Sequence, residues 1–89
     1  MNQQTRNQLE KGLFYTSDLA LSSALLAEGH NLCDLDFSDT RKTCFVFVED
    51  QELRDAIKDY WDGRMRVDPR AYFNTLKDLK SRIYNQKYV

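Results

Sequence analysis

The 89-residue chain has 42% hydrophobic and 12% aromatic side chains, enough for one small core, because chains of this size bury roughly 60% of their unfolded surface. This length excludes a second domain, and three glycines with one proline exclude a low-complexity linker. The net charge of -1 is unevenly distributed: residues 1–63 hold 6 Lys and Arg against 12 Asp and Glu, whereas residues 64–89 hold 7 against 2. A chain with this charge distribution can close on itself, pair head to tail with a second copy, or present its basic end to an anion.

Several features indicate where the chain resides. No apolar run approaches the roughly 18 residues that span a bilayer, and the first 12 residues lack the apolar segment of a signal peptide. Two cysteines without CxxC spacing favour a reducing compartment. We therefore expect a cytoplasmic protein without membrane contact, forming one domain over residues 1–89, with residues 1–12 flexible and 86–89 frayed.

The first predicted element is a short helix after Thr16-Ser17-Asp18, whose side-chain oxygens can cap its N-terminus. Gly29 suits a left-handed C-terminal stop. Most residues between the two signals are apolar, so this helix should be buried on most sides. The preceding Leu13-Phe14-Tyr15 is expected to pack beside its start.

Two strands should follow, over residues 32–37 and 42–48. The first alternates apolar and acidic side chains, and the second is rich in β-branched and aromatic residues. Residues 38–41 have the length of a hairpin loop, which predicts antiparallel pairing with Cys33 and Cys44 close together. The second strand is apolar on both faces and should be covered on both.

Two further helices are predicted in the C-terminal half. Asp50 caps the first, which has apolar residues at helical spacing and ends at Gly63. Asp68 and Pro69 open the second, and its packed side is expected to comprise Tyr72, Phe73, Leu76, Leu79, Ile83 and Tyr84. Residues 64–67 alternate and predict a short strand between the two helices.

The predicted fold class is α+β, a small single domain of order α-β-β-α-(β)-α with an antiparallel hairpin packed against helices. An isolated hairpin is marginal in water, so the sheet needs three helices packed on it, a third strand, or strands from a second copy. Among these alternatives we favour a homodimer that shares sheet or helix surface.

A set of caps, helix stops and core positions lies along the chain, namely Tyr15–Leu19 with Gly29, Phe45–Phe47 with Glu49 and Asp50, Tyr60 and Trp61 with Gly63, Val67–Pro69, Leu76 and Lys77, Leu79–Ser81, and Ile83 and Tyr84. In these residues the chain resembles a family of short, functionally uncharacterised proteins of bacteria and their phages or other mobile elements. The similarity spans most of residues 15–84 and implies an origin in such elements, but it implies no activity and no site residue.

The sequence shows no recognisable catalytic set. His30, the sole histidine, follows Gly29 at a helix end, where the dipole favours it whatever the function. Neither Cys33 nor Cys44 has an activating motif, and the isolated glycines provide no nucleotide loop. We expect a protein that is not an enzyme and that needs no cofactor and no metal.

One acidic group permits a sharper alternative. Asp34 and Asp36 share a strand face and could gather with Asp39, Glu49 and Asp50 around a divalent cation, as in a metal-dependent nuclease. That chemistry requires a lysine a residue or so beyond the acidic strand, and residues 48–51 contain none. A solvated acidic face, or pairing with the basic half, is the preferred interpretation.

The strongest binding candidate is basic. Positions on the last helix and just before it can contact phosphates, namely Arg64, Arg66, Arg70, Asn74, Lys77, Lys80 and Ser81. Alternatives are a solvated helix face or a protein partner. Interface candidates are Tyr60, Trp61, Phe45 and Phe47, although for the first two a core position is preferred. The leading hypothesis is a non-catalytic interaction or regulatory protein for a host macromolecule or small anionic ligand, and the alternative is a DNA- or RNA-binding regulator.

Overall fold

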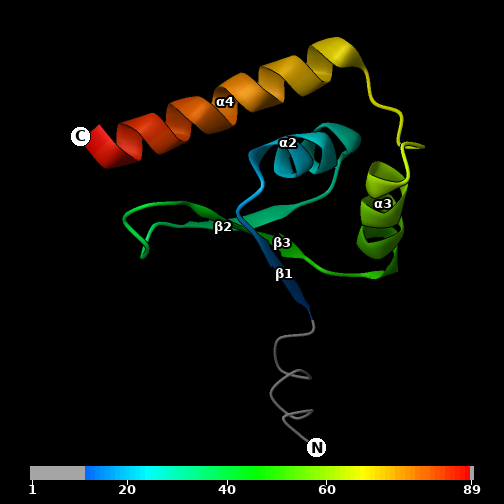
Figure 1. Ribbon diagram of the computed structural model, residues 1–89, viewed down its shortest axis with the longest axis horizontal. Helices are drawn as coiled ribbons and strands as arrows, with labels where there is room; N and C mark the ends of the chain where they lie inside the picture. The colour runs from blue at the N-terminus through cyan, green and yellow to red at the C-terminus, as the bar shows by residue number, and fades with distance from the viewer. Residues whose placement is uncertain (1–11, 89) are drawn as a thin grey trace, which may run out of the picture.

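A computed structural model describes the backbone of residues 12–88 and the side chains of residues 12–86. The elements are β1 (Leu13–Thr16), α2 (Leu19–Glu28), β2 (Leu32–Asp36), β3 (Cys44–Val48), α3 (Gln51–Trp61) and α4 (Pro69–Tyr88) (Figure 1). The α+β class is confirmed, with the order β-α-β-β-α-α. The expected flexibility of residues 1–12 falls almost wholly outside the described residues.

The sheet has three antiparallel strands in the order β1-β3-β2. The predicted pairing of β2 with β3 is confirmed. The sequence placed Leu13-Phe14-Tyr15 beside the start of α2 but did not predict a strand there. These residues pair with β3 as a third strand, from Leu13 opposite Val48 to Thr16 opposite Phe45. A third strand was one of three ways to support the hairpin, so β3 needs no strand from a second copy.

Residues 64–67 form no strand, contrary to the prediction. The backbone N–H groups of Arg64 and Met65 both donate to the Asp59 carbonyl, at 2.8 and 3.1 Å. These donors therefore close the C-terminus of α3 instead of joining a sheet, and Gly63 permits the reversal with φ of 76°.

Local signals position the helices as predicted. The Asp18 carboxylate accepts from the Leu21 N–H at 3.0 Å, and the Asp50 carboxylate accepts from the Leu53 N–H at 2.8 Å. Asp68 caps α4 in the same way, accepting from the Ala71 N–H at 2.8 Å, with Pro69 at the first helical position. Gly29 ends α2 in the left-handed conformation, with φ of 107°.

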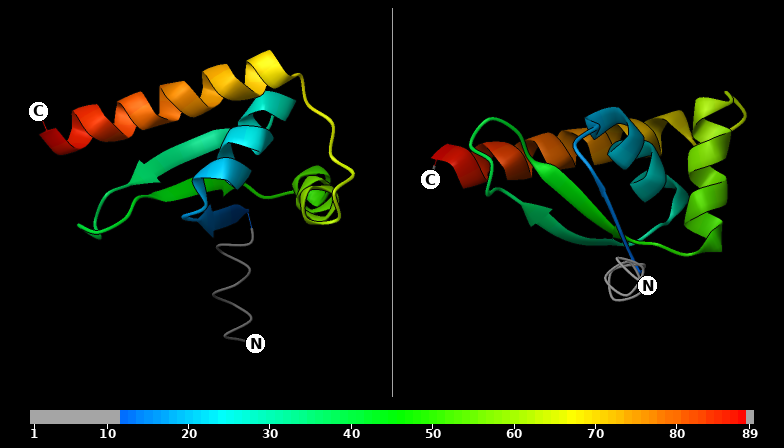
Figure 2. Two further views of the ribbon diagram at one scale, coloured as in Figure 1. Left: turned by 45° about the horizontal axis from the view of Figure 1, so that its top comes forward. Right: turned by 60° about the horizontal axis from the view of Figure 1, so that its bottom comes forward.

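The core lies between one face of the sheet and all three helices. Phe45 and Phe47 project from the inner face of β3 and are 1% and 0% exposed. They pack with residues of the helices, namely Leu21 and Leu25 of α2, Leu53 and Ala56 of α3, and Leu79 of α4. Figure 2 shows α3 at one end of the sheet and α4 running past α2. Packing from α2 to both other helices fits its expected burial.

The outer face of the sheet is less well covered than expected. Val46 on this face is 5% exposed, flanked by its cross-strand partners Tyr15 and Asp34. Tyr15 and Val48 are 50% and 41% exposed. Within the described residues, the helices that line the core contribute to the inner face alone.

A bulge interrupts the hairpin and separates the two cysteines. Pairing shifts between Leu32 and Asp34, so Leu32 and Leu35 both reach the core although they are three residues apart. Cys44 pairs with Asp36 rather than lying opposite Cys33, so the expected proximity of the two cysteines is wrong. The offset of three strand residues corresponds to roughly 10 Å, beyond the roughly 7 Å that a disulfide spans between Cα atoms.

We predict that a mild oxidant forms no intramolecular disulfide, and that iodoacetamide modifies exposed Cys33 faster than half-buried Cys44. Intact mass and peptide mapping over time measure both outcomes, and Cys33→Ser should remove the fast phase. A fully oxidised monomer in the wild type would contradict this register.

The second prediction concerns the attachment of α4 to the core. Leu79→Ala should lower the free energy of unfolding by about 2–5 kcal/mol, because Leu79 is fully buried and its truncation leaves a cavity. Phe73→Ala on the same helix should cost much less, because Phe73 is 56% exposed. Urea denaturation followed by circular dichroism measures both, and equal losses would contradict the assigned orientation of α4.

Candidate functional site

The residues considered for catalysis have structural partners of their own. His30 Nε2 lies 3.1 Å from Glu28 Oε1, just past the left-handed stop of α2. Cys33 is exposed at the bulge, and Cys44 is half-buried on the neighbouring strand. Within the described residues, these positions place no nucleophile beside a base, so His30 is explained as a residue that closes a helix end.

The acidic residues are used locally rather than gathered. Asp34 accepts from the Leu35 N–H at 2.9 Å, and Asp39 accepts from the Arg41 N–H at 2.8 Å. The remaining members bond elsewhere: Asp36 to Ser38, Asp50 to the start of α3, and Glu49 to Arg54 at 3.4 Å. Across residues 12–86, no three Asp, Glu, His or Cys side chains are grouped as cation ligands.

Turn geometry explains the electrostatics of one of these carboxylates. The backbone N–H of Ser38, with its hydroxyl, holds the pKa of Asp36 below its usual value of 3.8. The same contact begins the hairpin loop. Asp36 therefore stabilises a turn in its ionised form, as expected of an acidic residue in a tight loop.

Among the described residues, a groove lies between β2 and α4. Three cavities of 460, 520 and 440 Å³ share Arg82 among their lining residues. Arg82 Nε lies 3.4 Å from Asp78 Oδ2, so its charge is already matched. On the β2 side, the Leu35 N–H already donates a hydrogen bond to the Asp34 carboxylate. Both the cation and one strand donor of the groove are thus engaged by the chain itself.

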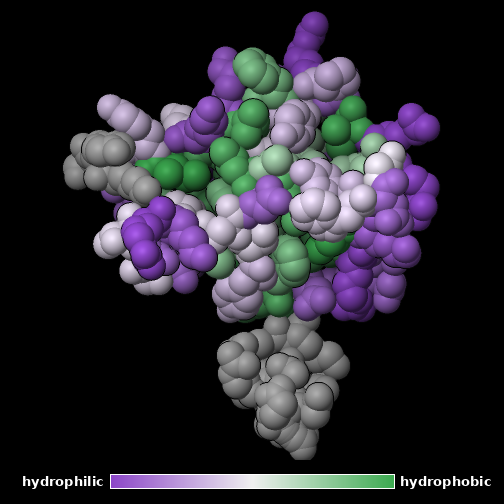
Figure 3. All heavy atoms as spheres, viewed as in Figure 1, coloured by the Kyte–Doolittle hydropathy of each residue, from purple (hydrophilic) through white to green (hydrophobic). Residues whose placement is uncertain are grey.

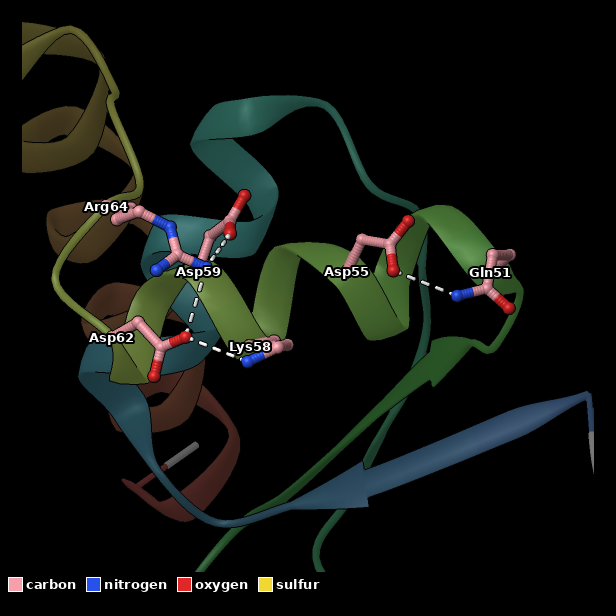
Figure 4. A network of polar contacts seen from close by, with 6 residues as sticks. All are labelled: Gln51, Asp55, Lys58, Asp59, Asp62 and Arg64. Carbon is pink, nitrogen blue, oxygen red and sulfur yellow. Dashed lines mark hydrogen bonds and ion pairs between the residues drawn. The ribbon is translucent and has the colours of Figure 1, made fainter.

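The outer side of α3 carries a network of ion pairs (Figure 4). Arg64 Nη2 lies 3.1 Å from Asp62 Oδ2 and 3.4 Å from Asp59 Oδ1, and Lys58 Nζ lies 3.0 Å from the same Asp62 oxygen. The sequence placed Arg64 among phosphate-binding residues, but the structure turns it toward carboxylates of its own chain. Arg64 is therefore a weak candidate for contact with an external anion.

The interface candidates divide between core and surface. Phe45 and Phe47 are enclosed by the chain itself and have no surface to offer a partner. Tyr60 packs against the core, and this burial, with a smaller contribution from Asp18, raises its pKa. The preferred core position of Trp61 is wrong, because it is 65% exposed at the end of α3 with its ring at 87° to that of Tyr60.

The exposed side of α4 brings together most of the predicted basic residues. We define the outward face of α4 as seven of its exposed residues, Arg70, Phe73, Asn74, Lys77, Lys80, Ser81 and Tyr84, and leave out other exposed residues toward the β2 groove, which include the pair Asp78 and Arg82. Five of these were predicted as binding residues from the sequence. Arg66 is exposed in the linker that precedes the helix. Along α4, Figure 3 shows hydrophilic and hydrophobic residues side by side at the surface.

Two residues of this face were assigned to the packed side of the helix, and that assignment is wrong. Phe73 and Tyr84 are 56% and 64% exposed. At about 100° per residue, they lie roughly 120° and 140° from fully buried Leu79, too far round the helix to reach the core. In the sequence, Phe73 and Tyr84 also lie at helical spacing from the cations, which would have indicated the exposed side of the helix, but they were assigned to the packed side.

Comparison with known proteins identifies the domain but no activity. Residues 11–85 match a family described as a domain of unknown function, DUF5659. The chain belongs to the DUF5659 family. No curated protein and no solved structure matches it. Within the DUF5659 domain, no helix of the described residues has both the length and the apolar character to cross a membrane.

The third prediction tests the α3 network. The pKa of Asp62 is lowered from 3.8, first by its hydrogen bond from Lys58 and then by smaller contributions that include Arg64. Lys58→Met should therefore raise this pKa more than Arg64→Gln does, as followed by carboxyl NMR titration. Arg41→Gln, in the distant hairpin loop, is the control and should leave it unchanged.

The sign of the pH effect follows from the direction of this shift. A lowered folded pKa means that the pairing of Asp62 stabilises the fold above the unfolded value of 3.8 and is lost as pH falls through the lowered folded value. Lys58→Met should therefore reduce the loss of folding stability that protonation of Asp62 causes at low pH. A larger pKa rise in Arg64→Gln would contradict the ranking of the two cations.

Proposed function

We propose that this DUF5659 protein is a non-catalytic binding protein that recognises an anionic macromolecule through the outward face of α4. We further propose that it acts in the cytoplasm on a host component and is encoded by a phage or other mobile element. The residue similarities that suggest this origin lie mostly at helix caps and core positions. They support the proposed origin in a phage or mobile element, but they do not support the choice of binding residues on α4.

The ion-pair pattern is the observation that supports this proposal. Among the described residues, five cations approach a carboxylate within 4.0 Å: Arg41, Arg54, Lys58, Arg64 and Arg82. No such pair involves Lys42, Arg66, Arg70, Lys77 or Lys80 in that part of the chain. Three of these five, Arg70, Lys77 and Lys80, share one face of α4. No carboxylate of the described residues neutralises these three charges, although Lys77 also lies over the Phe73 ring.

The chemistry of the partner follows from this local charge. The whole chain has a pI near 5.7, so a non-specific attraction to polyanions is not expected from its composition. A cationic face on an otherwise acidic protein attracts an anion in one orientation and repels it in others. Such a surface directs an anionic partner to one side of the protein.

A homodimer built on this face is disfavoured, because two copies would bring like charges together. The homodimer expected from the sequence remains a prediction for other surfaces. The exposed Tyr15 and Val48 on the outer face of the sheet are the apolar residues that such a contact would cover.

The fourth prediction tests the outward face by charge reversal. Lys77→Glu with Lys80→Glu should abolish retention on a heparin column and binding of labelled polyglutamate at low salt, because both cations lose their attraction for the polyanion. The matched control is Arg41→Glu with Lys42→Glu in the hairpin loop, which changes net charge equally. Equal loss in both variants, or no retention of the wild type, would contradict the proposal.

A further inference from the structure

Five residues of the outward face of α4 follow one another at a regular spacing along the sequence. Arg70, Phe73, Lys77, Lys80 and Tyr84 are separated by three, four, three and four residues. At about 100° per residue they fall within an arc of about 80°, and at about 1.5 Å per residue they extend over roughly 21 Å. They therefore form one narrow stripe along the helix, which we call the cation–aromatic stripe.

The stripe is accessible and free of acidic residues. Phe73 and Tyr84 are more than half exposed, and the three cations are exposed as well. The nearest carboxylate on the helix, Asp78, lies about 80° beyond the edge of the arc and pairs with Arg82 at 3.4 Å. Within the arc itself, an approaching anion meets three positive charges and no carboxylate.

The aromatic rings give this surface a second chemistry. Lys77 Nζ lies over the Phe73 ring, 5.3 Å from its centroid, so the positive charge rests against one face of the ring and a stacked base would use the opposite face. A carboxylate-rich protein can neutralise the cations, but it offers no flat partner to two exposed rings. Unpaired nucleobases offer such a partner next to each phosphate, and base stacking on aromatic side chains is tolerant of sequence.

Resting on the proposed function, we propose that the cation–aromatic stripe binds single-stranded nucleic acid, with phosphates on Arg70, Lys77 and Lys80 and bases stacked on Phe73 and Tyr84. The stripe has the length of roughly six stacked nucleotides at about 3.4 Å each. A duplex is a poorer ligand, because its bases are already stacked on one another. The outlying Asn74 and Ser81 flank the stripe and can donate to sugar or phosphate oxygens.

Fluorescence anisotropy with labelled oligothymidylate, oligouridylate and a hairpin duplex of matched length tests this proposal. Both single strands should bind more tightly than the duplex. A plot of the logarithm of the association constant against the logarithm of the salt concentration should have a slope of about -2, as three phosphate contacts imply. Equal affinity for the two single strands indicates readout that uses neither the 2′-hydroxyl nor the thymine methyl group. A preference for one of them is assigned to the sugar when oligodeoxyuridylate binds as oligothymidylate does.

Two variants separate stacking from charge. Phe73→Ala should weaken single-strand binding by about tenfold or more and leave the salt slope unchanged. Lys77→Gln should also weaken binding and should reduce the magnitude of the slope by about 0.7. Trp61→Ala and Lys42→Gln are the matched controls, an exposed aromatic and an unpaired cation away from the stripe, and neither should change affinity substantially.

The outcomes distinguish failure of this inference from failure of the proposed function. Tighter binding to the duplex, or equal losses in Phe73→Ala and Trp61→Ala, would overturn the stacking arrangement. Competition by polyglutamate as effective as by oligothymidylate, with Phe73→Ala unimpaired, would assign the face to an acidic protein and retain the proposed function. Binding of no polyanion by the wild type would overturn both.

Discussion

The enclosure of Phe45 and Phe47 on the inner face of β3 is the contact on which the rest of the structure depends. Two large aromatic side chains on one face of a short strand need cover that β1 and β2 alone do not supply, and Leu25, Leu53 and Leu79 provide it from three helices. All three helices are thereby drawn to one side of the sheet. The outer face is left to shield itself by cross-strand contacts, and the orientation of α4 is fixed by its buried leucine.

That orientation determines which residues of α4 meet solvent. A helix of 20 residues that buries one stripe has more than half of its circumference outside, and the residues opposite Leu79 are fixed by helical geometry once Leu79 is in place. Arg70 and Lys77 lie nearly opposite it, with Phe73 and Tyr84 beside them. The core contact and the candidate binding face are therefore two consequences of one rotation about the helix axis.

Local chemistry made much of the fold predictable from the sequence. Asp18, Asp50 and Asp68 cap helices because a short carboxylate after an extended residue finds free N–H groups within reach, whatever the tertiary context. Strand β1 was missed because four residues next to a helix cap show too little alternation to indicate a strand, and pairing with β3 is a long-range contact. Phe73 and Trp61 were assigned to packing because hydrophobicity alone does not say on which side of a helix the core lies. That information comes from the tertiary position of Leu79 and Leu53.

The uneven charge of the chain acquires a physical explanation in the folded state. In the acidic part, carboxylates cap helices, close turns and pair with the basic residues nearest to them, as Asp62 does with Lys58 and Arg64. Only two carboxylates follow Gly63, and both are engaged, Asp68 at a helix cap and Asp78 with Arg82. The outward face of α4 is positive because no carboxylate near it remains to pair with its cations, and not because the protein has an excess of basic residues.

The exposed aromatic side chains on this face add a second feature. Single exposed aromatics are common on protein surfaces, but Phe73 and Tyr84 lie on the same side of α4 as the cations and place apolar area where an external anion would be attracted. A ligand that offers both negative charge and flat apolar surface satisfies the two features at once.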